Sequence, residues 1–332
     1  MNLHDKIRVV HYGIGVIGCG AVRFASSKSR LEIVGAIDLC NTGKDLGDIA
    51  EVGRKLGVTI SANAEDVLLK SKPDVVVHTT SSSLEKVYPE LEQIVKAGVN
   101  IVSSCEELSY PYDTLPQLAK AIDEHAKTHE VSVLATGVNP GFLMDAWPLF
   151  MTGVCKRVDK VKVERIQDAS KRRIPFQKKI GAGKSIDEFN DLVKKRIIRH
   201  VGLSESVAMV AAGLGWELDK ITESIEPVVC DGQTKNAYIT VEPGQAAGVR
   251  QIGSGWKKGR IVIDLLFEAS VGAKESYDSV CIKGEPDMDV IIKGGTNGDI
   301  ATIAILINAI PQVINARPGL LTMKDLVISA MP

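Results

Sequence analysis

The chain has 332 residues, of which 45% are hydrophobic and 24% charged, and its formal net charge is −1. This length and composition are those of a globular protein large enough for two domains. A nearly neutral chain is not strongly attracted to nucleic acid or to an anionic membrane surface, so neither is expected as a partner.

No targeting segment and no metal site are expected. The N-terminus enters a strand pattern almost directly, without the apolar core or the cleavage site of a signal peptide. The most apolar late stretch, residues 300–316, is interrupted by polar residues and a proline, and it is predicted to be a buried helix. The six cysteines are scattered without a C-x-x-C pair, which is typical of free thiols in a cytoplasmic protein. His125 and His129 stand four residues apart, but no third metal ligand accompanies them.

The first 141 residues alternate between short apolar runs and amphipathic stretches. We predict helices over residues 18–29, 84–98 and 115–130. The predicted strands are IRVVHYGIG, EIVGAIDLC, PDVVVHTTSS, VNIVSS and VSVLATGVNPG. Apolar strands separated by amphipathic helices are typical of a parallel sheet covered on both faces. The fold class is therefore α/β, with a doubly wound Rossmann domain.

The second half of the chain has longer alternating runs, which indicate an inserted α+β domain on a mostly antiparallel sheet. We expect the Rossmann domain to span residues 1–145 and a substrate and dimerisation domain to span residues 146–296. Residues 297–332 are expected to form a C-terminal helix that packs back on the Rossmann domain. A homodimer through the inserted sheet is also expected, because an open sheet face is usually covered.

A glycine motif follows the first predicted strand. Gly13, Gly15 and Gly18 spell G-x-G-x-x-G between that strand and a helix, and Asp38 ends the next strand. This context predicts a dinucleotide whose pyrophosphate lies at the helix N-terminus. Asp38 can accept hydrogen bonds from the ribose hydroxyls and would repel a 2′-phosphate, which favours NAD, while the polar residues at 41–44 leave NADP open. The alternatives are a glycine turn without a ligand and a capping aspartate.

The other predicted strands also end in polar residues, and ligands of such sheets bind beyond these ends. His78 is interpreted as a hydrogen-bonded structural residue. The expected cofactor contacts are Gly13, Gly15, Val16, Ile17, Gly18, Asp38, Thr80, Ser81, Ser82 and Asn139.

Two adjacent carboxylates, Glu106 and Glu107, follow the strand VNIVSS on the nicotinamide side of the predicted crevice. One interpretation is an acid–base carboxylate aimed at the reacting carbon. The other is that both glutamates cap the next helix, where negative charge is favoured. We expect one of the two to cap and the other to act in catalysis.

Three longer motifs resemble a known family. SSCEELSYP, ATGVNPGFLMDAWPL and RIQDASKRRIPFQKKIGAG are similar to those of the 2,4-diaminopentanoate dehydrogenases and the native amine dehydrogenases, distant relatives of dihydrodipicolinate reductase. The resemblance covers essentially the whole chain. It implies that NAD or NADP oxidises a primary amine carbon to a ketone with release of ammonia, at the C4 amine for the name-giving substrate. It also places the catalytic glutamate in the pair Glu106 and Glu107, of which we favour Glu107 because SYP follows it directly.

The basic segment KRRIPFQKK is interpreted as a substrate-contacting strand in which Arg172 or Arg173 clamps a carboxylate. The alternative is a solvated edge strand and loop. Phe142 and Trp147 are expected to form an apolar wall between the domains. The expected substrate contacts are Thr136, Asn139, Phe142, Trp147, Arg172 and Arg173.

The sequence therefore predicts an amine dehydrogenase that also catalyses the reverse reductive amination. An imine reductase like dihydrodipicolinate reductase is the first alternative, although that family's His-His/Lys loop is not visible here. A non-catalytic NAD(P)-binding sensor is the second.

Overall fold

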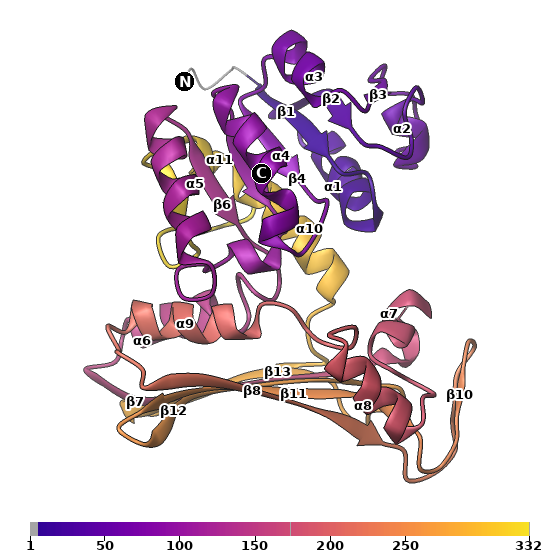
Figure 1. Cartoon of the computed structure of the whole chain (residues 1–332), viewed down its shortest axis with the longest axis vertical. Helices are drawn as coiled ribbons and strands as arrows, with labels where there is room; N and C mark the ends of the chain where they lie inside the picture. The colour runs from indigo at the N-terminus through magenta and orange to yellow at the C-terminus, as the bar shows by residue number, and fades with distance from the viewer. Residues whose placement is uncertain (1–5, 173, 332) are drawn as a thin grey trace. The chain divides into compact units, whose positions relative to one another are not determined.

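The computed structural model describes residues 6–172 and 174–331. They divide into two compact units (Figure 1). The first comprises the chain up to Phe142 together with residues from Asn297 onward, and the second comprises Leu143–Thr296. The chain thus leaves the first unit once and returns to it.

The first unit is built on a seven-stranded sheet in the order β15-β6-β5-β4-β1-β2-β3, and all neighbouring strands are parallel. Its strands are β1 (Ile7–Tyr12), β2 (Leu31–Ile37), β3 (Ile60–Ser61), β4 (Val75–His78), β5 (Asn100–Ser103), β6 (Ser132–Ala135) and β15 (Gly319–Leu321). The first six strands have the 3-2-1-4-5-6 order of a doubly wound sheet. This confirms the predicted Rossmann fold, to which the C-terminal segment adds the seventh strand.

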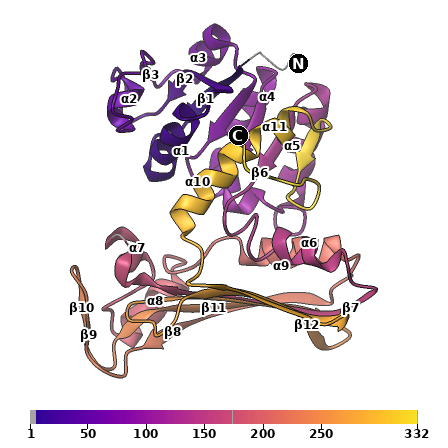
Figure 2. The same ribbon diagram turned by 180° about the vertical axis from the view of Figure 1, so that it is seen from behind.

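Helices cover both faces of this sheet (Figures 1 and 2). One face carries α1 (Val16–Ser26), α10 (Gly298–Asn308) and α11 (Ile310–Ile314). The other carries α3 (Ala64–Ser71), α4 (Leu84–Lys96) and α5 (Pro116–Thr128), with α2 (Leu46–Ile49) and the 3-10 turn η1 (Glu106–Leu108) at the sheet's periphery.

The predicted C-terminal helix is two helices, α10 and α11, which meet at Ala309. Pro311 explains the break. Its backbone nitrogen carries no hydrogen to donate, and its ring would clash with the preceding turn of a continuous helix.

The second unit contains a six-stranded sheet in the order β14-β13-β7-β12-β11-β8. Neighbouring strands are antiparallel except for the parallel pair β7 and β12, which confirms the predicted, mostly antiparallel α+β domain. Its strands are β7 (Arg157–Asp168), β8 (Lys220–Val229), β11 (Ala246–Lys257), β12 (Arg260–Ser270), β13 (Tyr277–Glu285) and β14 (Met288–Lys293). A separate hairpin joins β9 (Thr234–Lys235) to β10 (Thr240–Val241).

Helices of the second unit lie along one face of its sheet (Figure 1). They are α6 (Ala146–Thr152), α7 (Ile174–Lys179), α8 (Ile186–Lys194) and α9 (Leu203–Gly213), with the 3-10 turn η2 (Ala169–Lys171) after β7. The contact with α9 is close, since a Cβ on Gly253 of β11 would stand 2.9 Å from Leu203.

The predicted strand at KRRIPFQKK is wrong, because Lys171 ends η2 and Ile174–Lys179 form α7. The side chain of Asp168 accepts a hydrogen bond from the N–H of Ser170 at 2.9 Å and begins the turn there. Pro175 then occupies the first turn of α7, a helical position that suits proline.

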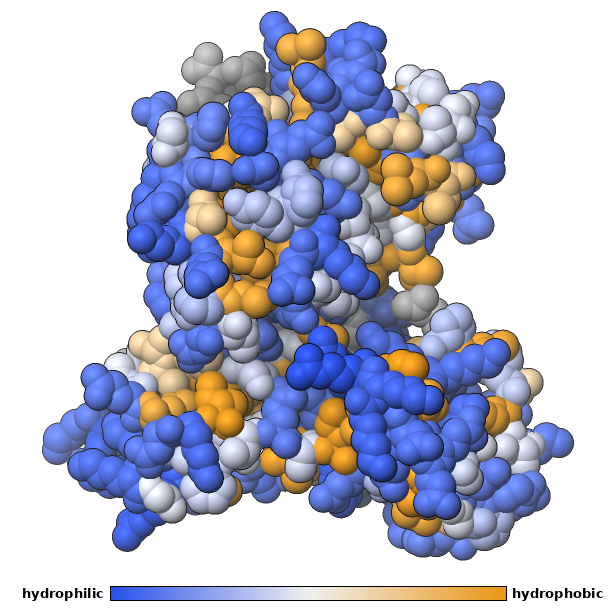
Figure 3. All heavy atoms as spheres, in the orientation of Figure 1, coloured by the Kyte–Doolittle hydropathy of each residue, from blue (hydrophilic) through white to orange (hydrophobic). Residues whose placement is uncertain are grey.

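The surface seen in Figure 3 is largely hydrophilic, and its apolar side chains gather in small separate groups. The longest helices of the described chain, α4 and α5, have 13 residues each. A bilayer span needs roughly 20 apolar residues. Accordingly, no described helix has the length and apolar character to cross a membrane.

Candidate active site

The turn between β1 and α1 is shaped by its glycines. Gly13 has φ +91°, and a Cβ there would stand 2.6 Å from the carbonyl oxygen of Thr79. A Cβ on Gly18 would overlap the carbonyl of Gly13, so both positions are closed by the protein itself. Gly15 differs, since its φ is −81° and a Cβ there would meet no described atom within 4 Å. Open space therefore lies in front of the N-terminus of α1, where free N–H groups favour an anion.

The predicted cofactor residues Val16 and Ile17 begin α1 directly after this opening. Val16 is 53% exposed, and Gly15 caps the helix without any side-chain hydrogen bond. The backbone amides of the first turn are thus available to a ligand. The cradle at Gly15 fits the pyrophosphate of a dinucleotide.

Asp38 follows β2 and is bound to the same turn. Its Oδ2 accepts the N–H of Ile14 at 2.8 Å, and its Oδ1 accepts the N–H groups of Cys40 at 2.8 Å and Asn41 at 3.1 Å. The predicted ribose-binding carboxylate is therefore half-buried beside the glycine turn. It also caps its own loop, which was the alternative reading of this residue.

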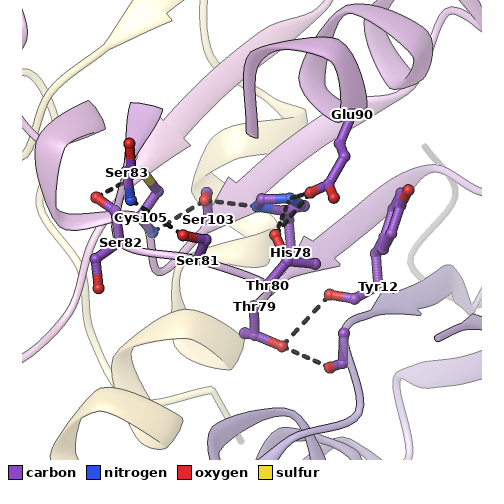
Figure 4. Close-up of polar contacts among 11 residues, drawn as sticks. Tyr12, His78, Thr79, Thr80, Ser81, Ser82, Ser83, Glu90, Ser103 and Cys105 are labelled. Carbon is purple, nitrogen blue, oxygen red and sulfur yellow. Dashed lines mark hydrogen bonds and ion pairs between the residues drawn. The ribbon is translucent and has the colours of Figure 1, made fainter. Parts of the chain in front are cut away.

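The loop after β4 joins the glycine turn to the rest of the sheet edge (Figure 4). Thr79 donates its hydroxyl to the carbonyl of Gly13 at 2.7 Å. The predicted cofactor residues Thr80, Ser81 and Ser82 follow on this loop. The carbonyl of Ser82 accepts the Sγ–H of Cys105, 3.4 Å away in the turn after β5. The ends of β1, β4 and β5 are thus tied together.

The two glutamates lie in η1, directly after β5, and both are half-buried. Glu107 Oε2 accepts the N–H of Leu84, the first residue of α4, at 2.9 Å. Ser83, the N-cap residue of α4, makes no side-chain cap, so Glu107 supplies one in its place. Leu108, fully buried, anchors the turn in the core.

Other groups near the glutamates are poor acid–base or nucleophilic candidates. Burial raises the pKa of the Cys105 thiol, so this group stays protonated at neutral pH. Burial, together with the charges of Asp113 and Asp325, also raises the pKa of Tyr110. The two carboxylates are therefore the remaining acid–base candidates of this turn.

The loop after β6 holds the other predicted site residues of the first unit. The N–H of Thr136 donates to the carbonyl of Ser103 at 2.8 Å, which places it beside the end of β5. Its hydroxyl is buried and has no hydrogen-bond partner among the described residues. Asn139 is 7% exposed and Phe142 39%. The predicted residues of five strands, β1, β2, β4, β5 and β6, thus come together at one edge of the sheet.

Two predicted substrate residues are described in the second unit, while Arg173 lies outside the described residues. Trp147 is half-buried in α6. The guanidinium of Arg172 stacks 4.4 Å from the centre of the Phe176 ring and donates to Gln167 Oε1 at 3.3 Å.

Sequence reasoning missed two buried polar groups. The first joins His78, Ser103 and Glu90 in the first unit, and it confirms only that His78 is hydrogen-bonded. The second is the ion pair of Arg165 with Asp278 at 3.0 Å in the second unit. The alternation of β7 indicates a buried arginine, because Arg165 follows two buried valines on the same face of the strand.

No cluster of three or more metal-ligating side chains occurs within residues 6–172 and 174–331. His125 Nδ1 lies 3.7 Å from Glu92 Oε1.

Comparison with known families gives two matches along the chain. A model of the 2,4-diaminopentanoate dehydrogenase C-terminal domain matches residues 142–331. A model of the dihydrodipicolinate reductase N-terminus matches residues 7–108. The second match covers the glycine turn, Asp38 and the two glutamates.

Individual proteins resemble the chain over nearly its whole length. The 2,4-diaminopentanoate dehydrogenase of Acetoanaerobium sticklandii is 36% identical, over 97% of this chain and 94% of that protein. An amine dehydrogenase of Streptomyces virginiae is 24% identical, over 96% of each. The solved structure of the amine dehydrogenase from Mycobacterium smegmatis superposes with a TM-score of 0.84 at 25% identity, over 98% of each chain.

Proposed function

Because the chain belongs to the 2,4-diaminopentanoate dehydrogenase family, we propose that it oxidises the C4 amine of a 2,4-diaminopentanoate-like substrate to a ketone and ammonia. The same site would catalyse the reverse reductive amination. The chain is a dehydrogenase acting on CH–NH2 donors, with an NAD(P)-binding domain. The observation that carries the proposal is the half-buried carboxylate pair after β5, at the edge where a dinucleotide binds such a sheet.

Glu106 is proposed as the acid–base group. The sequence favoured Glu107, but that side chain caps α4 through its contact with Leu84. A carboxylate held against a helix N-terminus is stabilised in place by the N–H groups and the dipole. Its neighbour in the same turn is then the better candidate to exchange a proton with a substrate.

The chemistry needs a base beside the reacting carbon. A bound nicotinamide supplies the acceptor for the hydride that leaves this carbon. Glu106 removes one proton from the substrate ammonium, so that the nitrogen lone pair can form the C=N bond. The resulting iminium cation is stabilised by nearby negative charge. Water then adds to the iminium carbon, the carboxylate relays protons, and the C–N bond breaks to leave a ketone and ammonium.

NAD is proposed as the preferred cofactor, and NADP as a second cofactor of the same site. The support is Asp38, whose carboxylate lies beside the glycine turn and would repel a 2′-phosphate. Thr80, Ser81, Ser82 and Asn139 are proposed to line the remainder of this cofactor site.

Arg172 is proposed to bind the substrate carboxylate, together with Arg173. A guanidinium can bind a carboxylate through two parallel hydrogen bonds. The packing of Arg172 on Phe176 supports a defined orientation of this side chain. Thr136, Asn139, Phe142 and Trp147 are proposed as further substrate contacts.

A homodimer through the second unit's sheet is also proposed. Ile252 of β11 and Leu266 of β12 are paired across the two strands, and both are only half-buried. They point away from α9, because the next residue, Gly253, faces Leu203 of that helix. Apolar side chains on an otherwise open face favour self-association. The free thiols of all six cysteines support a reducing cytoplasm as its location.

An initial-rate screen tests the proposal. Purified protein is assayed with NAD and NADP against diamino acids, α-amino acids and simple amines, where reduced cofactor and ammonia are measured as products. It is also assayed with NADH and NADPH against cyclic imines, where consumption of the reduced cofactor is measured. We expect equal amounts of both products with a carboxylate-bearing diamine. Turnover of cyclic imines alone would instead identify an imine reductase, and cofactor binding without any turnover would identify a sensor.

A further inference from the structure

A buried hydrogen-bond chain joins the end of β4 to the turn after β5, and the proposed mechanism does not use it (Figure 4). The side chain of His78 is completely buried. Its Nδ1 lies 2.9 Å from Ser103 Oγ, and its Nε2 lies 2.8 Å from Glu90 Oε2 on α4. Thr80 donates its hydroxyl to the same carboxylate oxygen at 2.6 Å. A hydrogen-bonded network around a buried side chain holds its members in one arrangement.

The direction of each hydrogen bond in the chain follows from the chemistry of its members. Partial burial disfavours ionised Glu90, but hydrogen bonds from His78 and Thr80 outweigh this effect and lower its pKa. Ionised Glu90 can only accept, so His78 Nε2 carries a hydrogen and donates it. In the neutral ring Nδ1 then accepts from the hydroxyl of Ser103. Ser103 Oγ in turn accepts the N–H of Cys105 at 3.1 Å.

The far end of this chain is the turn that carries the glutamates. Cys105, just before Glu106, is held through its N–H on Ser103 Oγ. Glu107, just after it, donates its N–H to the carbonyl of Ser82 at 3.3 Å. The backbone of Glu106 is therefore fixed on both sides.

The order serine, histidine, glutamate resembles a hydrolase triad, but the geometry excludes that function. Ser103 is completely buried, and its Oγ is occupied by the N–H of Cys105. A nucleophile must instead reach a substrate. The network instead holds the backbone of the turn after β5 in place.

We infer that His78 is a positioning residue, which acts through Ser103 to hold the turn of Glu106 at the cofactor edge of the sheet. This inference rests on the proposed role of Glu106. Displacing a catalytic group by about 1 Å can cost about 10²-fold in rate. Loss of the Ser103 contact should therefore lower kcat, while the glycine turn and Asp38, which are untouched, keep cofactor affinity unchanged.

Two variants separate the contacts of His78. The amide of asparagine reaches the place of Nδ1, whereas that of glutamine reaches the place of Nε2. His78→Asn thus keeps a partner for Ser103, and His78→Gln keeps one for Glu90. We expect His78→Gln to lower kcat by about tenfold or more, with an unchanged Kd for NAD, and His78→Asn to recover most of this loss. Glu92→Gln is the matched control, because Glu92 lies on the same helix but pairs with Lys96.

A second arm tests whether the effect passes through Glu106. In a Glu106→Gln background, His78→Gln should cause no further loss of kcat, because the group to be positioned is gone. If Glu106→Gln keeps its rate, the proposed catalytic role of Glu106 fails. If Glu106→Gln loses its rate but His78→Gln does not, the positioning role fails. Equal losses in both His78 variants, matched by equal losses of Tm, would also overturn it in favour of a structural role.

Ser103→Ala keeps the inference testable if the His78 variants do not fold. It removes the acceptor of the Cys105 N–H and changes little volume. It should lower kcat at unchanged Kd for NAD, and wild-type kcat in a folded Ser103→Ala protein would contradict the inference.

Discussion

At the residue scale, Asp38 combines a structural and a binding role. Its carboxylate is bound to the N–H groups of Ile14, Cys40 and Asn41, and these bonds hold the glycine turn against its own loop. Each carboxylate oxygen can accept about two hydrogen bonds. Oδ2, with Ile14 as its hydrogen-bond donor, therefore keeps capacity for a ribose hydroxyl.

Asp38→Ser should shift cofactor preference towards NADP. The change removes the repelling charge and leaves the N–H groups of Cys40 and Asn41 to face a 2′-phosphate. We expect the ratio of kcat/KM for NADP to that for NAD to rise about tenfold or more, the effect of one charge-assisted hydrogen bond. Asp48→Ser, in α2, is the control and should leave the ratio unchanged. A wild-type protein that binds NADP at least about tenfold more tightly than NAD would refute the role given to Asp38.

His11 is a second residue whose environment is unusual. It is completely buried in β1, and neither ring nitrogen has a hydrogen-bond partner among the described residues. Burial lowers its pKa to about 3, so the folded protein keeps the ring neutral. The unfolded chain protonates this ring near pH 6.5. The contribution of neutral His11 to the free energy of unfolding is therefore fully present above that pH, and it is lost as the pH falls towards 3.

His11→Leu should remove this part of the pH dependence. Between pH 7 and pH 5 the wild type should lose about 2 kcal/mol more of its unfolding free energy than the variant does. Urea unfolding at the two pH values measures the difference. Parallel losses in wild type and variant would show that His11 is protonated, or hydrated, in the folded state.

At the element scale, the glycines of the turn between β1 and α1 have two different roles, one in folding and one in ligand binding. Gly13 and Gly18 are closed by protein atoms, but Gly15 faces open space. Gly13 and Gly18 are therefore needed for the turn to form, whereas Gly15 is needed for a ligand to approach.

Gly15→Ala should weaken the cofactor without weakening the fold. Its φ of −81° suits alanine, and the new methyl group would enter the space proposed for the pyrophosphate. We expect Kd for NAD to rise by about tenfold or more, as for loss of about 1.4 kcal/mol of binding, with unchanged Tm. Gly232→Ala, which also meets no described atom within 4 Å, is the control. Unchanged Kd for NAD would place the pyrophosphate elsewhere.

The predictability of the elements depends on how local their causes are. The strands before Asp38 and Glu106 follow from apolar runs, and the sheet edge then places their polar ends together. β15 has only three residues and forms by pairing with β6, so no local pattern announces it. The basic segment that forms α7 is predicted to be a strand, whereas the turn begun by Asp168 decides its shape. The contact of His78 with Glu90 joins a strand to a helix and is visible only in the folded unit.

At the scale of the whole molecule, a buried ion pair fixes the point at which the chain leaves the second unit. Arg165 and Asp278 are 3.0 Å apart, with their side chains 3% and 1% exposed. Asp278 Oδ2 accepts the N–H of Thr296 at 2.7 Å, and the Thr296 carbonyl accepts from Arg165 and Gln167, each at 3.0 Å. The next residue, Asn297, caps α10 of the first unit.

Asp278→Asn should destabilise the second unit strongly, because it leaves the charge of Arg165 buried without its partner. The expected loss is about 3–5 kcal/mol of unfolding free energy, measured by chemical denaturation. Asp159→Asn is the control, since Asp159 belongs to an exposed pair with Arg157 and should cause no measurable loss. A small effect of Asp278→Asn would mean that water reaches Arg165.

The central claim is that the carboxylate of Glu106 moves the proton in amine oxidation, and steady-state kcat of Glu106→Gln on a confirmed amine substrate tests it most directly. We predict a loss of about 10²-fold or more, with an unchanged Kd for NAD. Glu107→Gln is the matched comparison and should show a lower Tm with a milder loss of rate, because it weakens the cap of α4. Near-wild-type kcat in Glu106→Gln, with the large loss in Glu107→Gln or in neither variant, would contradict the account.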